Sequence, residues 1–213
     1  MPAAIDTHLI AIRHGETEWN SQGRFQGHLN SVLNAAGLAQ AEALGEYLAR
    51  ERFDLLLSSD LGRALQTASA VAMRTGHEIV VEPRLRERRM GIFQGLTPDE
   101  VRARYPDEYA RFRSHDPDYV IPDGESVRQL FERSVACFTE LAARHSGLTL
   151  AVVTHGGVLA MLYRHARAMP LQAPRDFPLH NTGINRFQYR MGAWRLQNWG
   201  EIGHLDLALD DPE

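Results

Sequence analysis

Short apolar runs in this sequence end in arginine, histidine and glycine, residue types that can bind anions and transfer groups. The junctions at these ends are Arg13-His14-Gly15, Ser58-Ser59-Asp60 with Arg63 close behind, and Thr154-His155-Gly156-Gly157. Arginine binds phosphate through paired planar donors. An imidazole can act as a nucleophile or as a base. Together these residue types suit chemistry on a tetrahedral anion.

The apolar runs before the junctions predict buried strands. Residues 9–12, 55–57 and 150–153 are apolar without a polar break, a pattern typical of parallel strands covered on both faces. Open α/β sheets bind their ligands at the carboxyl ends of the strands. We therefore expect the polar groups that follow the runs to meet at one edge of a single sheet.

Each of these side chains also has a purely structural interpretation. Arg13 and His14 could be surface residues after a strand, and His155 could be a hydrogen-bonded histidine without a direct role. Arg63 falls in the first turn of an expected helix, off its apolar stripe, where a cation opposes the helix dipole. An anion bound at that helix end would explain the arginine. Because all the junctions converge, we favour a site for a tetrahedral dianion such as phosphate.

Several other chemistries are not expected. The sequence has no Gly-x-x-x-x-Gly-Lys loop and no His-Glu-x-x-His helix, which argues against a nucleotide P-loop and a zincin-type metal site. The adjacent arginines also disfavour a metal ion held by His14 and His155. Cys137, the single cysteine, lies among apolar residues of a helical pattern and is interpreted as core. No serine competes persuasively, so an imidazole is the candidate nucleophile.

Glu87 lies in an arginine-rich stretch, and two interpretations of it stay open. Its neighbours are Arg84, Arg86, Arg88 and Arg89. The group could be a surface ion-pair cluster, which would add little stability. Alternatively, Glu87 could transfer a proton while some of the arginines contact an anion.

Composition limits the protein class. The chain has 213 residues, of which 44% are hydrophobic and 23% are charged, enough for one sizeable core. The net charge of -4 argues against a nucleic-acid partner, and a single cysteine excludes an intrachain disulfide. Residues 1–6 lack the features of a signal peptide, and no run approaches membrane-spanning length. We therefore expect a cytoplasmic protein without a membrane partner.

Periodicity and capping residues predict the remaining elements. Asn34 is a plausible N-cap for a helix whose apolar stripe includes Leu38, and Asp60 is a candidate cap for a helix over residues 61–72. Ser126 and Gln129 form a capping box. The other expected elements are a helix over 127–142, a strand over 78–82, a hairpin of 184–189 and 194–199 around Met191-Gly192, and an acidic tail over 201–213.

Residues 97–115 predict two short amphipathic helices that are split before Pro106, with Phe112 used for packing. We assign the whole chain, residues 1–213, to one domain in which residues 97–124 form a helical insertion over the site. In the loop after the first strand, each polar residue could contact a ligand or simply face solvent. These loop residues are Asn20, Arg24 and Gln26.

The motifs, taken together and in order, resemble those of the histidine phosphatase superfamily. The segments that carry the resemblance are Arg13-His14-Gly15-Glu16-Thr17, Ser58-Ser59-Asp60-Leu61-Gly62-Arg63-Ala64-Leu65-Gln66-Thr67-Ala68, Leu85-Arg86-Glu87 and Thr154-His155-Gly156-Gly157. The branch is the one that contains cofactor-dependent phosphoglycerate mutases and small phosphatases. The resemblance covers nearly the whole chain. It implies an α/β fold, a three-layer α/β/α sandwich with a mostly parallel sheet and helices on both faces.

The resemblance also implies roles for individual residues. His14 would be the nucleophile that becomes phosphohistidine, and Glu87 would be the proton donor. The phosphate pocket would be formed by Arg13, Arg63 and His155. Further substrate contacts would come from Asn20, Gln26, Gly27 and Gly156. No metal and no cofactor would be needed.

We expect a phosphomonoesterase that hydrolyses a small phosphorylated metabolite through a phosphohistidine intermediate. One alternative is a cofactor-dependent phosphoglycerate mutase, in which case a 2,3-bisphosphoglycerate primer would be needed. Another is a non-catalytic binder of a phosphorylated ligand, which the presence of both His14 and Glu87 weakens. The compact segment between Glu87 and Ser126 and the short tail after Trp199 resemble the small phosphatases, whereas Gln94 resembles the mutases. The sequence assigns no oligomeric state.

Overall fold

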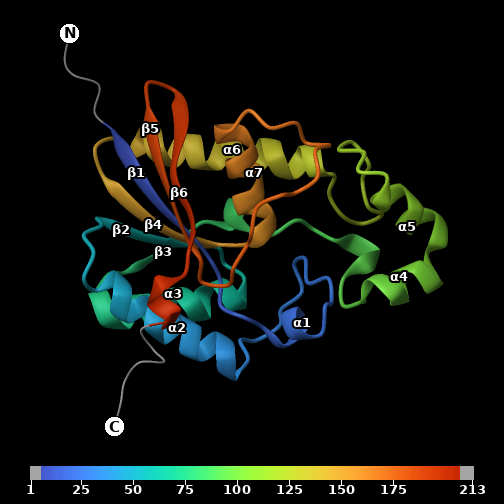
Figure 1. The fold of residues 1–213 in the computed structure, drawn as a ribbon, viewed down its shortest axis with the longest axis horizontal. Coiled ribbons are helices and arrows are strands. Elements are labelled where there is room, and N and C mark those ends of the chain that lie inside the picture. Colours follow the sequence, from blue (N-terminus) through green and yellow to red (C-terminus); the bar gives the residue numbers. More distant parts are fainter. Residues whose placement is uncertain (1–5, 207–213) are drawn as a thin grey trace.

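The computed structural model describes residues 6–206, which contain a six-stranded sheet in the order β3-β2-β4-β1-β5-β6 (Figure 1). Strand β1 pairs parallel with β4, β4 with β2, and β2 with β3, whereas β5 pairs antiparallel with both β1 and β6. The mostly parallel sheet is thus confirmed. The strands are β1 (Thr7–Arg13), β2 (Leu55–Ser58), β3 (Ile79–Val81), β4 (Thr149–Thr154), β5 (Ile184–Arg190) and β6 (Ala193–Glu201).

Alternate side chains of the central strands enter separate cores on the two faces of the sheet. In β1, Leu9 and Ala11 join the core that contains residues of α6 and α7. Ile10 and Ile12 join the core that contains residues of α2 and α3, so the apolar run is buried on both faces as expected. Figure 1 shows these helix pairs on opposite faces of the sheet. Their bounds are α2 (Ala35–Leu48), α3 (Gly62–Thr75), α6 (Val127–Arg144) and α7 (Gly156–Ala166).

The structure confirms two of the expected helix caps and corrects the third. The Asn34 side chain accepts a hydrogen bond from the Gly37 N–H at 2.8 Å, and the capping box of Ser126 and Gln129 is present. Asp60 does not cap α3, because Leu61 occupies the N-cap position without a side-chain bond. The Asp60 carboxylate instead accepts two hydrogen bonds from the Arg86 guanidinium, at 2.7 and 2.5 Å.

The apolar stripe predicted for α2 is wrong at its first position. Leu38 is 50% exposed, whereas Leu44 and Leu48 are fully buried. The expected hairpin is confirmed, with Met191 and Gly192 both at positive φ between β5 and β6. A two-residue turn of this hand matches the twist of its flanking strands.

The region over residues 97–115 forms the two predicted short helices, α4 (Pro98–Arg104) and α5 (Pro106–Arg113). They stand to one side of the sheet (Figure 1). Phe112 packs there against a small separate core built around Phe93 and Tyr119. The remaining helices are the one-turn α1 (Glu18–Ser21) and α8 (Gly203–Asp206), with 3-10 turns at Pro83–Leu85 and Gly91–Phe93.

Two expectations concern the chain ends. Residues 1–5, most of the segment judged not to be a signal peptide, and residues 207–213, most of the acidic tail, lie outside the described residues. Within residues 6–206, no helix combines the length and the apolar character that crossing a membrane requires.

Candidate active site

His14 follows the last residue of β1, and backbone contacts on two sides hold it there. Its N–H donates to the Thr154 carbonyl of β4 at 3.0 Å. Its carbonyl accepts the Asn181 side-chain amide at 2.9 Å, and the neighbouring Thr182 N–H binds the Arg13 carbonyl at 3.0 Å. The imidazole is 3% exposed. The ring is therefore fixed at the carboxyl edge of the sheet.

The two ring nitrogens of His14 have different partners, which defines the tautomer. Nδ1 lies 2.7 Å from the Gly15 carbonyl, which can only accept, so Nδ1 carries the proton. Nε2 accepts a bond from Nε of Arg63 at 3.2 Å. Burial, followed by the charges of Arg63 and Arg13, lowers the pKa of His14 well below its ordinary value. His14 is thus a neutral imidazole with its lone pair on Nε2.

Gly15 is required by a close approach between two segments and not by its backbone conformation, since its φ is not positive. A Cβ on Gly15 would lie 2.6 Å from the carbonyl oxygen of Gly37 in α2, and a Cβ on Gly37 would lie 1.9 Å from the carbonyl oxygen of Glu16. The paired glycines let the segment after His14 pack directly against the helix. The Gly15 N–H also donates to Oγ1 of Thr67 at 3.0 Å, which ties this segment to α3.

Arg63 is a buried cation in the first turn of α3. It is 1% exposed, and its terminal nitrogens donate to the carbonyls of Leu29 and Gly27 at 3.0 and 2.9 Å. Burial lowers the pKa of Arg63 to about 10, so the guanidinium keeps its charge at neutral pH. Arg63 therefore does not face water, although it lies off the apolar stripe of its helix.

Arg13 supplies a second cation beside His14. It donates to the Leu179 carbonyl, and its buried Nε has no partner within residues 6–206. Burial lowers the pKa of Arg13, the charge of Glu87 opposes this, and the charge of Arg175 adds to it. Arg13 and Arg63 thus supply two desolvated guanidinium groups to one cavity, which favours binding of an anion there.

His155 packs beside His14 and is fully buried. The two ring centres are 5.2 Å apart. Nε2 of His155 lies 2.9 Å from Oγ of Ser59, whereas its buried Nδ1 has no partner in the described part of the chain. Burial and then the charge of Arg63 lower the pKa of His155 well below its ordinary value. The ring therefore offers one unused nitrogen next to the nucleophile candidate.

Glu87 is held by backbone donors from two segments. Its Oε1 accepts the Arg88 N–H at 2.7 Å, and its Oε2 accepts the Gly157 N–H at 3.0 Å. A Cβ on Gly157 would lie 2.1 Å from Oε1 of Glu87, so only glycine leaves room for the carboxylate against the start of α7. Glu87 makes no ion pair with the arginines around it within residues 6–206. The surface ion-pair interpretation is therefore wrong for Glu87 itself.

A cavity of about 420 Å³ joins these groups. The predicted site residues that line it are Arg13, His14, Asn20, Gln26, Gly27, Arg63 and Glu87. His155 and Gly156 are not in its lining. Gly156 lies beside Arg13, where a Cβ would be 3.5 Å from Nε. The substrate contacts assigned to His155 and Gly156 stay predictions.

The loop contacts differ in what they leave available. Oδ1 of Asn20 accepts bonds from the backbone and hydroxyl of Thr17, in the capping box of α1. Oε1 of Gln26 is buried without a partner among the described residues. Arg24 lines the cavity but pairs with Glu100 at 2.6 Å.

Some lining residues were missed from the sequence. Gly157 and Arg88 line the cavity. They directly follow Gly156 and Glu87, so the sequence motifs already pointed to these positions. Phe112 was assigned to packing alone, yet it both packs and lines the cavity. Arg175 has no local motif, and its place depends on the loop between α7 and β5. Within residues 6–206, no cluster of three or more histidine, cysteine or carboxylate side chains is arranged to hold a metal ion.

Comparison with known proteins supports one family. The family model of the histidine phosphatase superfamily (branch 1) matches residues 9–202. Phosphoglycerate mutase-like protein 4 of Arabidopsis thaliana is 38% identical over 202 residues, covering 93% of this chain and 86% of the relative. The metal-independent phosphoserine phosphatase of the same plant is 39% identical over 202 residues, covering 93% and 83%.

A solved structure agrees with this assignment. Bacillus stearothermophilus YhfR matches with a TM-score of 0.86 and 31% identity, covering 93% of this chain and 99% of that one. The family match spans β1 to β6 and includes every junction that lines the cavity. This chain therefore belongs to branch 1 of the histidine phosphatase superfamily and is a phosphoryl-transfer enzyme.

Proposed function

We propose that the enzyme hydrolyses phosphomonoesters of small metabolites through a phosphohistidine on His14. The observation that carries the proposal is the state of this imidazole. It is buried and neutral, its Nδ1 proton is committed to the Gly15 carbonyl so that its lone pair is on Nε2, and His14 lines a cavity that Glu87 also lines. A neutral nucleophile and an acid on one cavity are what phosphoryl transfer from an ester requires.

In the first step, Nε2 of His14 attacks phosphorus in line with the ester oxygen. The N–P bond forms, the P–O bond breaks, and Glu87 gives its proton to the departing alkoxide. In the structure, Nε of Arg63 donates a hydrogen bond to Nε2 of His14. For the lone pair of Nε2 to attack, this donor has to turn toward a phosphoryl oxygen. Arg13, Arg63 and His155 then stabilise the charge on the equatorial oxygens.

In the second step, water attacks the phosphohistidine from the side that the alcohol left. Glu87, now ionised, removes a proton from that water, and the N–P bond breaks to release inorganic phosphate. His14 returns to the neutral imidazole with its proton on Nδ1. The same carboxyl group thus serves as acid and then as base.

We infer that no metal is needed, because guanidinium groups supply the positive charge that a metal would supply in other phosphatases. The name of the metal-independent phosphoserine phosphatase supports this inference. The cavity volume of about 420 Å³ suits a small phosphorylated metabolite. The cytoplasmic location expected from the sequence stays a prediction.

Phosphate release from a panel of phosphorylated metabolites and 4-nitrophenyl phosphate tests the function. The wild-type enzyme should release phosphate and, when quenched with ³²P-labelled substrate, carry an acid-labile, base-stable adduct. His14→Ala should fold, release none and carry no adduct. An acid-stable adduct on the wild type, or any adduct on His14→Ala, would rule out the phosphohistidine step. A folded wild type that only binds the substrates would support the non-catalytic alternative.

The mutase alternative is favoured by the phosphoglycerate mutase-like relative and by Gln94. However, Gln94 is not among the residues that line the cavity. Its Oε1 accepts the His28 N–H at 2.7 Å and lies against Gly27. Its influence on the reaction would therefore be indirect. Conversion of 3- to 2-phosphoglycerate, assayed with and without the bisphosphate primer, separates the two. Primer-dependent isomerisation much faster than phosphate release would make this a mutase.

A further inference from the structure

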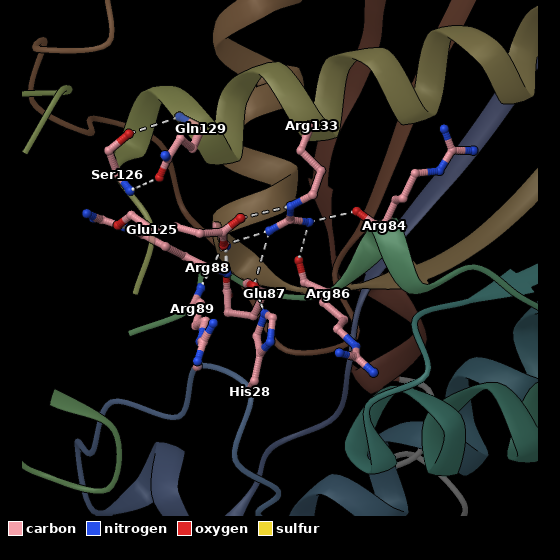
Figure 2. A network of polar contacts seen from close by, with 12 residues as sticks. His28, Arg84, Arg86, Glu87, Arg88, Arg89, Glu125, Ser126, Gln129 and Arg133 are labelled. Atoms are coloured by element: carbon pink, nitrogen blue, oxygen red, sulfur yellow. Dashed lines mark hydrogen bonds and ion pairs between the residues drawn. The ribbon is translucent and has the colours of Figure 1, made fainter. Parts of the chain in front are cut away.

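Arg133, a residue of α6 outside the cavity lining, reaches the backbone of the segment that carries Glu87 (Figure 2). One terminal nitrogen donates to the carbonyls of Arg84 and Arg86 at 2.7 and 2.9 Å. The other donates to the carbonyl of Glu87 itself at 3.4 Å. A single guanidinium therefore spans the residues on the amino-terminal side of Glu87.

Glu125 holds the Arg133 guanidinium in place. Its two carboxylate oxygens accept from Nε and a terminal nitrogen of Arg133 at 3.0 and 2.9 Å, a two-point geometry that sets the plane of the group. Burial raises the pKa of Glu125, but the bonds from Arg133 and from the Arg89 N–H lower it overall, so the carboxylate is ionised at neutral pH. Both side chains are largely shielded, at 22% and 20% exposure, where an ion pair is less screened than on the surface.

Glu125 also holds the residues that follow Glu87. Its carboxylate accepts the Arg89 N–H at 2.8 Å, and its own N–H donates to the Arg89 carbonyl at 2.9 Å. Its carbonyl accepts Nε of Arg88 at 2.9 Å. The segment is thus held on both sides of Glu87 by one pair of residues.

This segment needs such support because it has no regular structure of its own. After the 3-10 turn at Pro83–Leu85, no helix or strand begins before Gly91. In the described part of the chain, the hydrogen bonds to the Glu87 carbonyl come from Arg133 and from Nε2 of His28, the latter at 2.9 Å. A misplacement of about 1 Å at a reacting group can cost about 100-fold in rate.

We propose that Arg133 and Glu125 act as a positioning pair that fixes the backbone of Glu87 so that its carboxyl group meets the leaving oxygen. The proposal rests on the proposed acid role of Glu87. Neither residue lines the cavity, and the side-chain hydrogen bonds of both go to one another and to the segment around Glu87. Their loss should therefore impair proton donation and leave phosphate binding by Arg13 and Arg63 intact.

The test compares Arg133→Met with Arg128→Met. Arg128 is on the same helix and makes a two-point pair with Asp118, but the two side chains are 45% and 60% exposed. Within residues 6–206, the Arg128 side chain makes no hydrogen bond to the segment that carries Glu87. The substrates are phenyl phosphate and 4-nitrophenyl phosphate, which have nearly the same shape but differ in how much the leaving oxygen needs a proton.

Arg133→Met should lower kcat for phenyl phosphate by about 10- to 100-fold, lower it much less for 4-nitrophenyl phosphate, and change KM little. Arg128→Met should match the wild type on both substrates. Arg133→Lys should restore only part of the loss, because an ammonium cannot reproduce the planar two-point contact. Equal losses on the two substrates, or no loss on either, would overturn the proposal.

A Glu87→Gln background provides a second readout. If Arg133 acts through Glu87, adding Arg133→Met to Glu87→Gln should lower kcat for phenyl phosphate no further. Fully multiplicative losses would refute the positioning role. If Arg133→Met does not fold, as judged by circular dichroism, Glu125→Gln carries the same comparison. Absence of phosphohistidine in the wild type would instead reject the proposed function, so the two failures are distinguishable.

Discussion

At the scale of single residues, the chemistry of His14 depends on groups that touch its two nitrogens. The Gly15 carbonyl takes the proton of Nδ1, and Arg63 donates to Nε2. Burial then keeps the ring neutral, which leaves the lone pair available for phosphorus. The same side chain exposed on a surface would be partly protonated near neutral pH.

Glu87→Gln should lower kcat for an alkyl phosphate such as phosphoserine by about 10²- to 10⁴-fold, the range for loss of one general acid. The loss should be smaller for 4-nitrophenyl phosphate, because nitrophenolate leaves with little help from a proton. Steady-state kinetics on both substrates measure this. A loss of the same size on both would indicate that Glu87 is not the acid.

The two buried histidines should make stability depend on pH. Burial lowers the pKa of both His14 and His155 well below the ordinary value, which is about 6.5. Below that pH, these histidines bind protons in the unfolded chain but not in the native state, so the free energy of unfolding falls as the pH drops. The fall is at most about 1.4 kcal/mol per pH unit for each histidine. Above that pH, neither histidine contributes a pH dependence.

Urea denaturation of the wild type and of His155→Gln between pH 5 and 7 checks this prediction. The variant should show a weaker decline in unfolding free energy toward pH 5. His115→Asn is the control, since His115 is exposed and its φ of 59° suits asparagine. This control should follow the wild type, and an unchanged slope for His155→Gln would contradict the prediction.

At the scale of elements, α2 and α3 cover one face of the sheet and also position the site. α3 carries Arg63 into the cavity and ties Gly15 through Thr67. α2 packs so closely on the segment after His14 that glycine is needed on both sides. The packing of these helices on the sheet therefore also fixes the position of the nucleophile.

Two leucines of α2 that differ in burial should differ sharply in their contribution to stability. Leu44→Ala should lower the free energy of unfolding by about 2–5 kcal/mol, because it removes a fully buried side chain from the core. Leu38→Ala, at a half-exposed position of the same helix, should stay within about 0.5 kcal/mol of the wild type. Comparable losses at the two positions in urea unfolding would mean that the core side of α2 has been misassigned.

At the scale of the whole molecule, the cavity gathers segments that are far apart in the chain. β1 supplies Arg13, the loop after it supplies Gln26 and Gly27, and the arginine-rich segment supplies Glu87. The short helix α5 adds Phe112 from beside the sheet. All of the positive charge at the cavity comes from arginines.

Activity should therefore survive removal of metal ions. Exhaustive chelation followed by gel filtration should leave kcat and KM for 4-nitrophenyl phosphate unchanged, because guanidinium groups perform the electrostatic work. Orthovanadate, which accepts five-coordinate geometry, should compete with substrate for the same pocket. Loss of activity on chelation with recovery on adding one divalent ion would contradict the proposed pocket.

Local sequence patterns were sufficient to predict the main strands and helices and the edge of the sheet at which a ligand would bind. Continuous apolar runs are typical of strands that are buried on both faces, which predicted central strands at residues 9–12 and 150–153. Parallel strands place their carboxyl ends together, which brings His14 and the His155 junction to one edge. The capping box at Ser126 and the turn at Met191 were likewise local, since their bonds join residues close in the chain.

Contacts between segments that are distant in the chain could not be predicted from local patterns. Asp60 has the right side chain for a cap, yet Arg86 reaches it from another segment. Whether Glu87 belonged to a surface cluster or to the cavity depended on Gly157, and its support depended on Arg133, a residue far along the chain. The protonation of His14 was equally non-local, because burial, the charge of Arg63 in α3 and the charge of Arg13 at the end of β1 set it. Sequence patterns report periodicity and local bonds, whereas desolvation and long-range hydrogen bonds exist only once the chain has folded.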